Sequence, residues 1–300
     1  MEIRVLRYFL TIAREGSITS AAEQLHITQP TLSRQIKDLE DELGQKLFHR
    51  SSHSMKLTQE GFIFRQRAEE IVAMVDKTSA EFLSMDKPLA GDIYIGGGET
   101  LAVSLIADLI AELRKEYPDI RYHLYSGNEA DVTERLDRGL LDFGILVQPA
   151  DLTKYDCIHL PAEDIWGVVM RKDAPLAQKK KITRADLLDL PLIMSRQVLV
   201  TKSNGNDFID WFGEDFDKLN IVTTFNLMYN AALMVKAGIG YAVSIDGIVN
   251  TDSESELCFR PLTPKMTSGL DLIWKKYPAF SPAAEMLLAR LQKKLIGDDN

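Results

Sequence analysis

The 300-residue sequence contains only two cysteines, Cys157 and Cys258. Two cysteines are too few for a disulfide framework and fit a reducing compartment, so we expect both to be packed thiols. No apolar run approaches the roughly 20 residues that a membrane-spanning helix needs, and the start MEIRVLRYFL lacks the long apolar region of a secretion signal. These absences predict a cytoplasmic protein with no membrane partner.

Sequence patterns of common enzymes and metal sites are also missing. The glycines at 96–98 lie between a predicted strand and a predicted helix, but Leu101 leaves the GxGxxG pattern of dinucleotide binding incomplete. The spacing of Cys157 and His159 does not match a recognisable zinc site. The sequence has no nucleophile elbow and no phosphate-binding loop with a following lysine. We therefore expect no enzyme, no metal site and no cofactor.

Positive charge is scarce, because 35 Lys and Arg residues face 44 Asp and Glu residues and the net charge is -9. Lys and Arg supply most of the non-specific affinity of proteins for DNA phosphates, so this balance excludes a surface that is basic overall. Any contact with nucleic acid must be local. With 45% hydrophobic and 26% charged residues, the chain is a globular protein long enough for more than one domain.

One segment near the N-terminus has the pattern that a local contact requires. Leu32, Ile36, Leu39 and Leu43 recur at spacings of four, three and four, which predicts the buried stripe of an amphipathic helix. The acidic residues at 40–42 lie in the second half of this helix, where DNA phosphates would be repelled. Only the first half of the helix therefore suits DNA.

Capping residues explain why this helix begins at residue 29. Thr28 can accept a hydrogen bond from the free backbone donors, and Pro30 fits the first turn, where its missing donor is not needed. Upstream, Ser17 can cap a second short helix, and apolar residues within 6–13 mark a first helix that closes a small core. Two helices with a tight connection and a basic tip are typical of a helix-turn-helix.

The start of the predicted helix carries side chains that can read DNA. Gln29 can bind an adenine edge, and Ser33 or Arg34 can reach a base or a phosphate. Residues 48–58 carry two basic side chains among polar ones and suggest a small wing beside the helix. Three amphipathic helices with a few exposed basic residues also occur in domains that bind no DNA, so periodicity alone leaves that alternative open.

Residues 6–50 read LRYFLTIAREGSITSAAEQLHITQPTLSRQIKDLEDELGQKLFHR, which resembles the winged helix-turn-helix of LysR-type transcriptional regulators, and the resemblance continues through Gly61. It implies a DNA-binding domain over residues 1–58, with double-stranded promoter DNA and RNA polymerase as partners. His53 stands where many family members carry arginine, and a neutral imidazole would hold phosphate more weakly. The predicted DNA contacts are Thr28, Gln29, Pro30, Thr31, Ser33, Arg34, Lys37, Arg50 and His53.

A long linker helix is predicted over residues 59–87, where Gly61 is the only glycine and no proline occurs. Mainly apolar residues from Phe64 to Met85 recur at alternating spacings of four and three, which is the period of a coiled-coil seam. The same stripe could rest on the helix's own domain, but a long exposed helix needs a partner, and the resemblance implies homodimerisation, often followed by a dimer of dimers. The predicted dimer contacts are Phe64, Ala68, Ile71, Val75 and Phe82.

The linker PLAGD at 88–92 separates this helix from a region in which strands and helices alternate. Such alternation predicts an α/β domain around a largely parallel sheet. The expected strands lie at 93–97, 121–127, 141–147, 165–171, 190–194, 221–225, 240–245, 257–262 and 269–276, and the expected helices at 100–116, 131–138, 206–212, 227–236 and 282–295.

Along the chain, the α/β region contains one series of strands and helices, then a second series, and finally one more strand and helix. A chain that adds a last strand and helix after a second series suggests two lobes joined by crossing segments. This order resembles the effector-binding region of LysR-type regulators, which is similar to periplasmic binding proteins. The resemblance implies an effector-binding domain over 92–300, with lobe 1 at about 92–161 plus 268–300 and lobe 2 at about 162–267. The predicted fold class is therefore a multidomain α and α/β protein.

A ligand of an open α/β sheet binds at the carboxyl ends of the strands, where helix N-termini offer backbone donors. Thr100, Ser195 and Asn226 follow predicted strands and are the preferred candidates, whereas Asn128 and Gln148 fit ordinary caps or turns equally well. The family resemblance brings these positions together. The predicted effector contacts are Gly98, Thr100, Leu101, Asn128, Val147, Gln148, Ser195, Arg196, Thr201, Phe225 and Asn226.

The chemistry of Arg196 predicts a small anionic effector, because a guanidinium fork matches carboxylate or phosphate, although Arg196 could equally pair with one of the many acidic side chains. Effector binding should change the angle between the lobes and thereby the spacing of the DNA-binding heads. The sequence thus predicts a LysR-type transcriptional regulator. The alternative is a metabolite-binding protein without a role in DNA regulation, which leaves the N-terminal segment unexplained.

Overall fold

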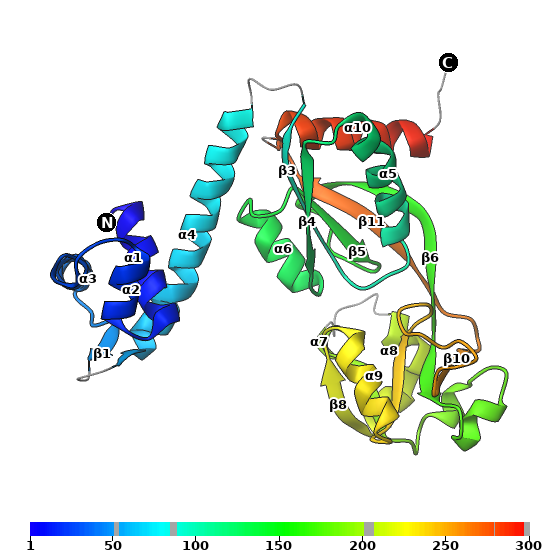
Figure 1. The fold of residues 1–300 in the computed structure, drawn as a ribbon. Coiled ribbons are helices and arrows are strands. Elements are labelled where there is room, and N and C mark those ends of the chain that lie inside the picture. Colours follow the sequence, from blue (N-terminus) through cyan, green and yellow to red (C-terminus); the bar gives the residue numbers. More distant parts are fainter. Residues whose placement is uncertain (51–53, 85–88, 201–206, 279, 297–300) are drawn as a thin grey trace. The chain divides into compact units, whose positions relative to one another are not determined.

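The computed structural model, drawn in Figure 1, describes residues 1–50, 54–84, 89–200, 207–278 and 280–296. The chain divides into two compact units, Met1–Leu83 and Ser84–Asn300. Unit 1 is helical with a small hairpin, and unit 2 is α/β, so the predicted fold class is confirmed. No helix within the described ranges is both long and apolar enough to cross a membrane.

Unit 1 is a set of packed helices closed by a two-stranded hairpin. Its apolar side chains converge on one core, in which Phe9 and Ile12 meet Leu32 and Ile36, all fully buried. Burial of such a side chain stabilises the unit by about 1.5–3 kcal/mol. The elements are α1 (Ile3–Glu15), α2 (Ile18–Gln24), α3 (Gln29–Leu43), β1 (Phe48–Arg50), β2 (Met55–Leu57) and α4 (Gln59–Ser84).

The helix ends of unit 1 follow from their capping residues. Ser17 Oγ accepts a hydrogen bond from the backbone three residues on, and Thr28 Oγ1 accepts one from the Thr31 amide, so both predicted caps are confirmed. Gly16 and Gly44 end α1 and α3 in the left-handed region, with φ of 64° and 66°, which glycine reaches without steric cost.

The second half of α3 differs from the predicted pattern at two positions. Leu43 was expected in the buried stripe, but it is 37% exposed because Gly44 ends the helix directly after it. Glu40 was expected on the outward acidic surface, but its side chain is buried. Its Oε1 accepts hydrogen bonds from the Leu47 and Phe48 amides at 2.9 and 3.3 Å. Glu40 therefore anchors the chain that leads into the hairpin.

Thr58 and Gly61 set the direction in which α4 leaves the hairpin. The Thr58 hydroxyl donates to the Lys46 carbonyl at 2.7 Å and accepts from the Gly61 amide at 2.9 Å. A Cβ at Gly61 would lie 2.1 Å from the Leu47 carbonyl oxygen, a distance that no side chain could adopt. The first turn of α4 is thus locked onto unit 1.

The first half of α4 packs against the core of its own unit. Phe64 makes an edge contact with Phe9 at 4.9 Å between ring centroids, and Ala68 is fully buried in the same core. Further along, Arg7 pairs with Asp76 at 2.5 Å. The prediction that Ala68 contacts a second copy of the chain is wrong, because its side chain is fully buried within unit 1, whereas the contact by the partly buried Phe64 stays a prediction.

Unit 2 contains one mixed sheet. Its strands are β3 (Gly91–Gly97), β4 (Ile120–Ser126), β5 (Phe143–Val147), β6 (Tyr155–Arg171), β7 (Leu192–Ser195), β8 (Ile221–Phe225), β9 (Tyr241–Ile245), β10 (Leu257–Pro261) and β11 (Thr267–Lys275). In space they follow the order β4, β3, β5, β11, β6, β9, β7, β8, with β10 also paired to β6. The strands β3, β4 and β5 are parallel, as are β7, β8 and β9. The prediction of a largely parallel sheet is wrong at the centre, where β6 and β11 run antiparallel to their neighbours.

The long strands β6 and β11 pass between two lobes (Figure 1). Lobe 1 contains β3, β4, β5 and the lobe 1 ends of both long strands, and lobe 2 contains β7 to β10 and the second half of β6. The ladder between β6 and β11 shifts register beside Gly269, where residues 161–162 of β6 form a bulge. The sequence pattern predicts no strand at 155–164, because polar residues and Pro161 interrupt the apolar pattern.

Helices cover both faces of each lobe. In lobe 1, α5 and α10 cover one face and α6 covers the other (Figure 1). In lobe 2, α8 and α9 belong to separate apolar clusters. The helices are α5 (Val103–Glu116), α6 (Glu129–Asp137), α7 (Arg196–Val200), α8 (Asp207–Phe212), α9 (Met228–Lys236) and α10 (Pro282–Ile296), with short 3-10 turns η1 (Pro175–Gln178), η2 (Arg184–Asp186) and η3 (Gly213–Lys218).

Two smaller expectations concern the linker and the cysteines. The predicted linker extends to Asp92, but Asp92 already belongs to β3, where it pairs with Arg121. Cys258 is buried and Cys157 is half-buried, and burial raises the pKa of both thiols. Both are free cysteines, as expected for packed thiols.

Candidate functional site

The start of α3 forms an exposed polar surface on unit 1. Thr28 and Gln29 open it, and Arg34 projects from it with 83% of its side chain exposed. The helix N-terminus adds the positive end of the backbone dipole, which favours a phosphate group. Of the predicted DNA contacts on this helix, Ser33 is half-buried and the others are exposed: Thr28, Gln29, Pro30, Thr31, Arg34 and Lys37.

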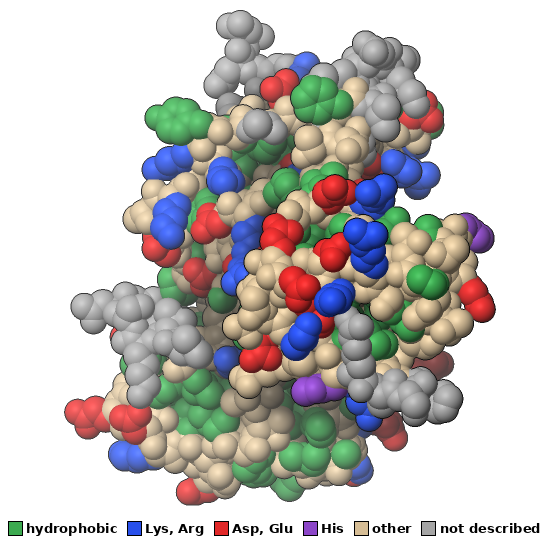
Figure 2. Space-filling model, turned by 90° about the vertical axis from the view of Figure 1, so that its left-hand side faces the viewer, with side chains coloured by type: hydrophobic (Ala, Val, Ile, Leu, Met, Phe, Trp, Pro, Cys, Tyr) green, Lys and Arg blue, Asp and Glu red, His purple; other side chains and the backbone are tan. Residues whose placement is uncertain are grey.

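The charges on this surface are available to an anionic partner. Arg34 has one acidic neighbour, Asp38, at 3.8 Å, and an exposed pair at that distance contributes little free energy. On the face drawn in Figure 2, basic and acidic side chains are interspersed among the coloured residues, and they form no broad basic patch. This distribution agrees with a contact confined to one helix start and its neighbourhood.

The hairpin supplies a wing beside α3. Phe48 and Met55 are buried in the core of unit 1 and fix the two strands to it. Arg50 ends β1 opposite Met55, and Lys56 on β2 is exposed. His53 lies outside the described residues.

A second candidate site is a cavity of about 130 Å³ between the two lobes of unit 2. Its walls combine apolar side chains with hydroxyl and amide groups, and the described lining includes no Lys, Arg or His. Residues from strand ends and helix starts of both lobes contribute. The lining residues are Gly98, Glu99, Gly127, Asn128, Val147, Gln148, Pro149, Trp166, Ser195, Gln197, Val198, Phe208, Phe225, Asn226, Met228, Ser244, Ile245, Ile248, Met266 and Ser268.

Seven of the predicted effector contacts lie in this lining. Asn128 is also the N-cap of α6, where its Oδ1 accepts from the Asp131 amide at 3.0 Å, so it serves as a cap and as part of the wall. Gln148 donates from Nε2 to Asp271 at 2.9 Å. Thr201 lies outside the described residues. The predicted residues that line the cavity are Gly98, Asn128, Val147, Gln148, Ser195, Phe225 and Asn226.

Three predicted effector contacts do not line the cavity. Thr100 is buried and donates to Asp164 at 2.9 Å, so its hydroxyl is used within the protein. Leu101 is 57% exposed and lies close to Gly247. Arg196 is exposed on the first turn of α7, whereas its neighbour Ser195 lines the cavity. Arg196 therefore lies outside the described lining, and its contact with an anion stays a prediction.

Asp164 is a buried carboxylate at the junction of the lobes. Its Oδ1 accepts from Thr100, and its Oδ2 has no hydrogen-bond partner among the described residues. Desolvation raises the pKa of Asp164 above its usual range, and the hydrogen bond from Thr100 offsets part of that rise. In the ladder Asp164 stands opposite Ser268, which lines the cavity and accepts from Trp166 Nε1 at 2.8 Å.

Hydrogen bonds join the lobes around the cavity. Glu99 of lobe 1 accepts from the Met228 amide at the start of α9, where a carboxylate also complements the helix dipole. Gln197 of lobe 2 donates to Glu129 of lobe 1 at 2.9 Å. Both bonds connect residues more than 60 positions apart and hold the walls at their present separation.

Several lining residues are not among the predicted effector contacts. Ser244 and Ile245 end β9, so the rule of strand carboxyl ends could have found them. Trp166, Phe208 and Met266 have no such local signal, because they look like core residues until the lobes are assembled.

Two family descriptions match almost the whole chain. "Bacterial regulatory helix-turn-helix protein, lysR family" matches residues 3–62, and "LysR substrate binding domain" matches residues 86–295. The chain belongs to the LysR family. The first match contains α1 to α3 and the hairpin, and the second contains every residue that lines the cavity.

Full-length LysR-family relatives support this assignment. The chain is 31% identical to the uncharacterized HTH-type transcriptional regulator YybE of Bacillus subtilis over 95% of this chain and 96% of that protein. It is also 31% identical to the Hca operon transcriptional activator HcaR of Escherichia coli, over 98% of each. The structure of full-length CbnR complexed with its target DNA matches with a TM-score of 0.73 at 19% identity, over 98% of this chain and 99% of that one, and at that identity shows the fold alone.

The LysR-family chain is therefore a transcriptional regulator with a DNA-binding helix-turn-helix and a substrate-binding domain. The helix-turn-helix match covers residues 3–62 of unit 1 and supports DNA as a partner, and the substrate-binding domain supports a small-molecule partner for unit 2. The family consists of transcriptional regulators, not enzymes.

Proposed function

We propose that this LysR-family regulator reads promoter DNA with the start of α3 and the hairpin and senses a small effector in the cavity between its lobes. One observation carries this proposal: a single cavity is lined by residues of both lobes, from Gly98 in lobe 1 to Ser195 in lobe 2. A ligand that contacts both walls binds one separation of the lobes more tightly than another. That differential affinity is the free energy available to shift the regulator between states.

The lining supports a small effector with an apolar body and one polar end. Trp166, Phe208 and Met266 supply apolar surface from lobe 2, and a cavity of this composition excludes large charged ligands. The polar end would be met by the hydroxyls of Ser195 and Ser244. We propose that this end is a carboxylate, bound by neutral donors in place of Arg196.

The carboxylate can be tested by calorimetric titration of the full-length protein. The probes are small aromatic and aliphatic carboxylates, each paired with its carboxamide. Binding of carboxylates at least about tenfold tighter than of their amides supports an anionic effector. A preference for the amides would overturn the anionic end but keep the cavity as the site, whereas no binding of either series would overturn the proposed ligand class.

Self-association through α4 is part of the proposal. Past the segment packed on unit 1, the side of α4 with coiled-coil spacing carries Ile71 and Phe82, which are 36% and 66% exposed, and the half-buried Val75. Apolar side chains at this spacing are covered when a second copy of the helix packs against them. A dimer would also provide two α3 surfaces for two DNA half-sites.

Two further roles follow from promoter binding. A regulator at a promoter acts in the cytoplasm and alters the access of RNA polymerase to the DNA. An effector-dependent change in the spacing of the α3 surfaces would alter DNA bending, which changes that access. Transcription from a bound promoter in a purified system with RNA polymerase tests this step, and the same output with and without the regulator would contradict it.

A further inference from the structure

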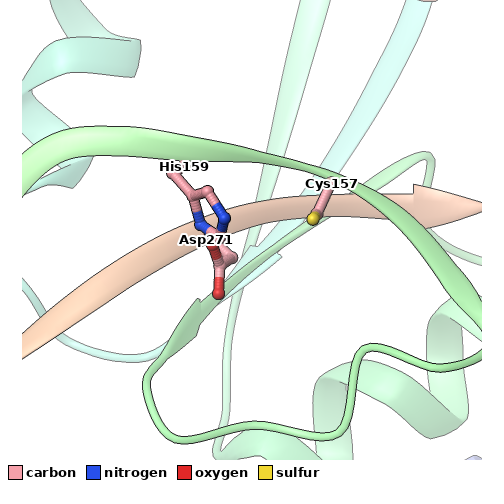
Figure 3. Close-up of side chains that lie close together, drawn as sticks. All are labelled: Cys157, His159 and Asp271. Atoms are coloured by element: carbon pink, nitrogen blue, oxygen red, sulfur yellow. Dashed lines mark hydrogen bonds and ion pairs between the residues drawn. The ribbon is translucent and has the colours of Figure 1, made fainter.

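Three side chains with metal-binding chemistry converge beside the interlobe cavity. Cys157 and His159 come from β6 and Asp271 comes from β11, and Figure 3 shows their side chains close together across the two strands. The candidate donor atoms, Sγ, an imidazole nitrogen and a carboxylate oxygen, all lie within 4.8 Å of one another. The sequence spacing of Cys157 and His159 alone predicts no metal site, because Asp271 is 112 residues from His159.

The strand register explains why these residues meet. His159 stands directly opposite Asp271 in the antiparallel ladder, and Cys157 lies two residues earlier on β6, opposite Ile273. Residues two apart on a strand point to the same face, so Cys157 and His159 share the face of Asp271. Packing of the ladder therefore fixes the backbone positions of all three residues.

The burial of the three side chains suits a site that a dissolved ion can enter. The Asp271 side chain is fully buried, Cys157 is half-buried, and the His159 side chain is 72% exposed. Within the described residues, His159 and Gln148 make the polar side-chain contacts of Asp271, and no Lys or Arg pairs with it. A buried carboxylate without a permanent cation gains free energy from a positive charge beside it.

We propose that Cys157, His159 and Asp271 form a binding site for a divalent transition-metal ion of the Zn²⁺ class. A thiolate, an imidazole and a carboxylate are the donors that Zn²⁺ takes in proteins. The thiolate excludes Mg²⁺ and Ca²⁺ as the preferred ions, because both select oxygen donors. The exposure of His159 leaves a fourth position for water, so the site would be open rather than closed.

Metal binding requires a small rearrangement of side chains. Bond lengths of about 2.0–2.3 Å around a tetrahedral ion place donor atoms roughly 3.4–3.8 Å apart. The donor cluster must contract slightly around the ion, while His159 and Asp271, now in direct hydrogen-bond contact, must separate. Rotation of the exposed His159 side chain supplies that change without moving the strands. The imidazole nitrogen that binds the ion gives up its hydrogen bond to Asp271, the neutral ring keeps its proton on the other nitrogen, and the Cys157 thiol proton is released to water.

Gln148 connects this metal site to the effector cavity. Its side chain donates to Asp271 Oδ2 at 2.9 Å, and the same residue lines the cavity. A partner hydrogen-bonded to a metal ligand orients that ligand and commonly changes metal affinity by about 10- to 100-fold. Metal binding would therefore change the hydrogen bonding of Gln148 and so alter one wall of the cavity. The metal site stands independently of the proposed effector, since its donors lie on lobe 1 alone.

The test uses Co²⁺ as the probe on the full-length protein, after treatment with a chelator and a reductant. A Cys–Co²⁺ bond gives a thiolate-to-metal charge-transfer absorption, and a four-coordinate site gives strong visible bands. We expect one Co²⁺ per chain with both signals, and displacement of Co²⁺ by Zn²⁺. Cys157→Ser should abolish the charge-transfer absorption, and His159→Ala should weaken binding by about 100-fold or more.

Controls separate this site from other ligands in the chain. Cys258→Ser alters the other cysteine, buried in lobe 2, and should leave both absorptions unchanged. Asp271→Asn removes a buried charge and can fail to fold, so the exposed His159→Ala is the deciding variant. Gln148→Ala should weaken binding by about tenfold. The site is overturned by wild-type protein without the charge-transfer absorption, by unchanged binding in His159→Ala, or by loss of the absorption only in Cys258→Ser.

Discussion

The proposed DNA-binding surface of unit 1 and the cavity of unit 2 are built in opposite ways. The start of α3 is one continuous, exposed and polar stretch with positive charge at Arg34 and Lys37. The cavity is mainly apolar, and its lining comes from segments between Gly98 and Ser268. A surface made by one helix keeps its shape when other parts of the chain move, whereas a cavity between lobes changes whenever they move. The first arrangement suits reading a fixed partner and the second suits sensing.

The largest effect is expected at Glu40, which anchors the chain that leads from α3 into the hairpin. Glu40→Ala leaves the buried amides of Leu47 and Phe48 without their acceptor, at about 1–3 kcal/mol for each unsatisfied group. Urea denaturation should show unit 1 unfolding at lower denaturant, with loss of DNA binding and unchanged effector binding. The exposed Glu42→Ala, on the same helix, is the control and should change stability by less than about 0.5 kcal/mol. Equal effects of both substitutions would contradict the role of Glu40.

The next effect concerns the exposed seam of α4. Replacing Ile71 and Val75 together by glutamate places charge in the proposed helix interface and should weaken self-association by about 3 kcal/mol, or roughly 100-fold. Sedimentation should show smaller assemblies, and operator binding should weaken in parallel. Glu69→Ala, an exposed change on the same helix, serves as the control. Unchanged mass together with unchanged DNA binding would rule out this interface.

Base reading by α3 is expected to contribute a smaller free energy. Gln29→Ala or Arg34→Ala should reduce the preference for operator over unrelated DNA by about 1–3 kcal/mol while leaving effector affinity unchanged. Mobility shifts at one fixed salt concentration measure both affinities. Lys265→Ala, an exposed change in lobe 2, controls for loss of one positive charge. An unchanged preference would mean that neither side chain reads a base.

The cavity can be tested with two adjacent residues. Ser195→Phe places an aromatic ring in a space of about 130 Å³ and should weaken effector binding by more than about tenfold. Arg196→Ala changes the neighbouring side chain, which is exposed and outside the cavity, and should change affinity by less than about twofold. Calorimetry on both variants distinguishes them. A larger loss in Arg196→Ala than in Ser195→Phe would place the effector elsewhere.

The smallest effect is a pH dependence of unit 2 stability. Burial raises the pKa of Asp164 in the folded state, so the folded state binds its proton more tightly than the unfolded state does. The stabilisation by the protonated form is complete below the unfolded pKa and is lost as pH rises through the folded pKa. Denaturation from about pH 4 to pH 8 should show a smaller decline in Asp164→Asn than in the wild type. Identical slopes would mean that Asp164 does not contribute.

Local features of unit 1 could be predicted from the sequence because their causes lie within a few residues. The Thr28 cap and the burial of Leu32 and Ile36 depend on neighbouring positions, and the structure confirms them. Glu40 could not be predicted, because an acidic residue on a helix is normally exposed and only the returning hairpin supplies the amides that bind it. Ala68 was assigned to the dimer contacts because one apolar spacing serves both a domain core and a helix dimer.

The sites in unit 2 depend on contacts between distant segments. Their positions after predicted strands identified Ser195 and Asn226, which line the cavity. The same rule could not show that the Thr100 hydroxyl donates a hydrogen bond to Asp164. Trp166 enters the lining only because the paired strands carry it between the lobes. The same pairing brings Asp271 to His159, which no sequence spacing encodes.

The most direct test of the account couples the cavity to the DNA-binding surface. Using the tightest-binding compound from the calorimetric titration, the operator affinity of full-length protein is measured with that compound absent and at saturation, for the wild type and for Ser195→Phe. The account predicts a change of about five- to 150-fold in the wild type and little or no change in Ser195→Phe. An equal change in both proteins, or no change in the wild type, would contradict control of DNA binding from this cavity.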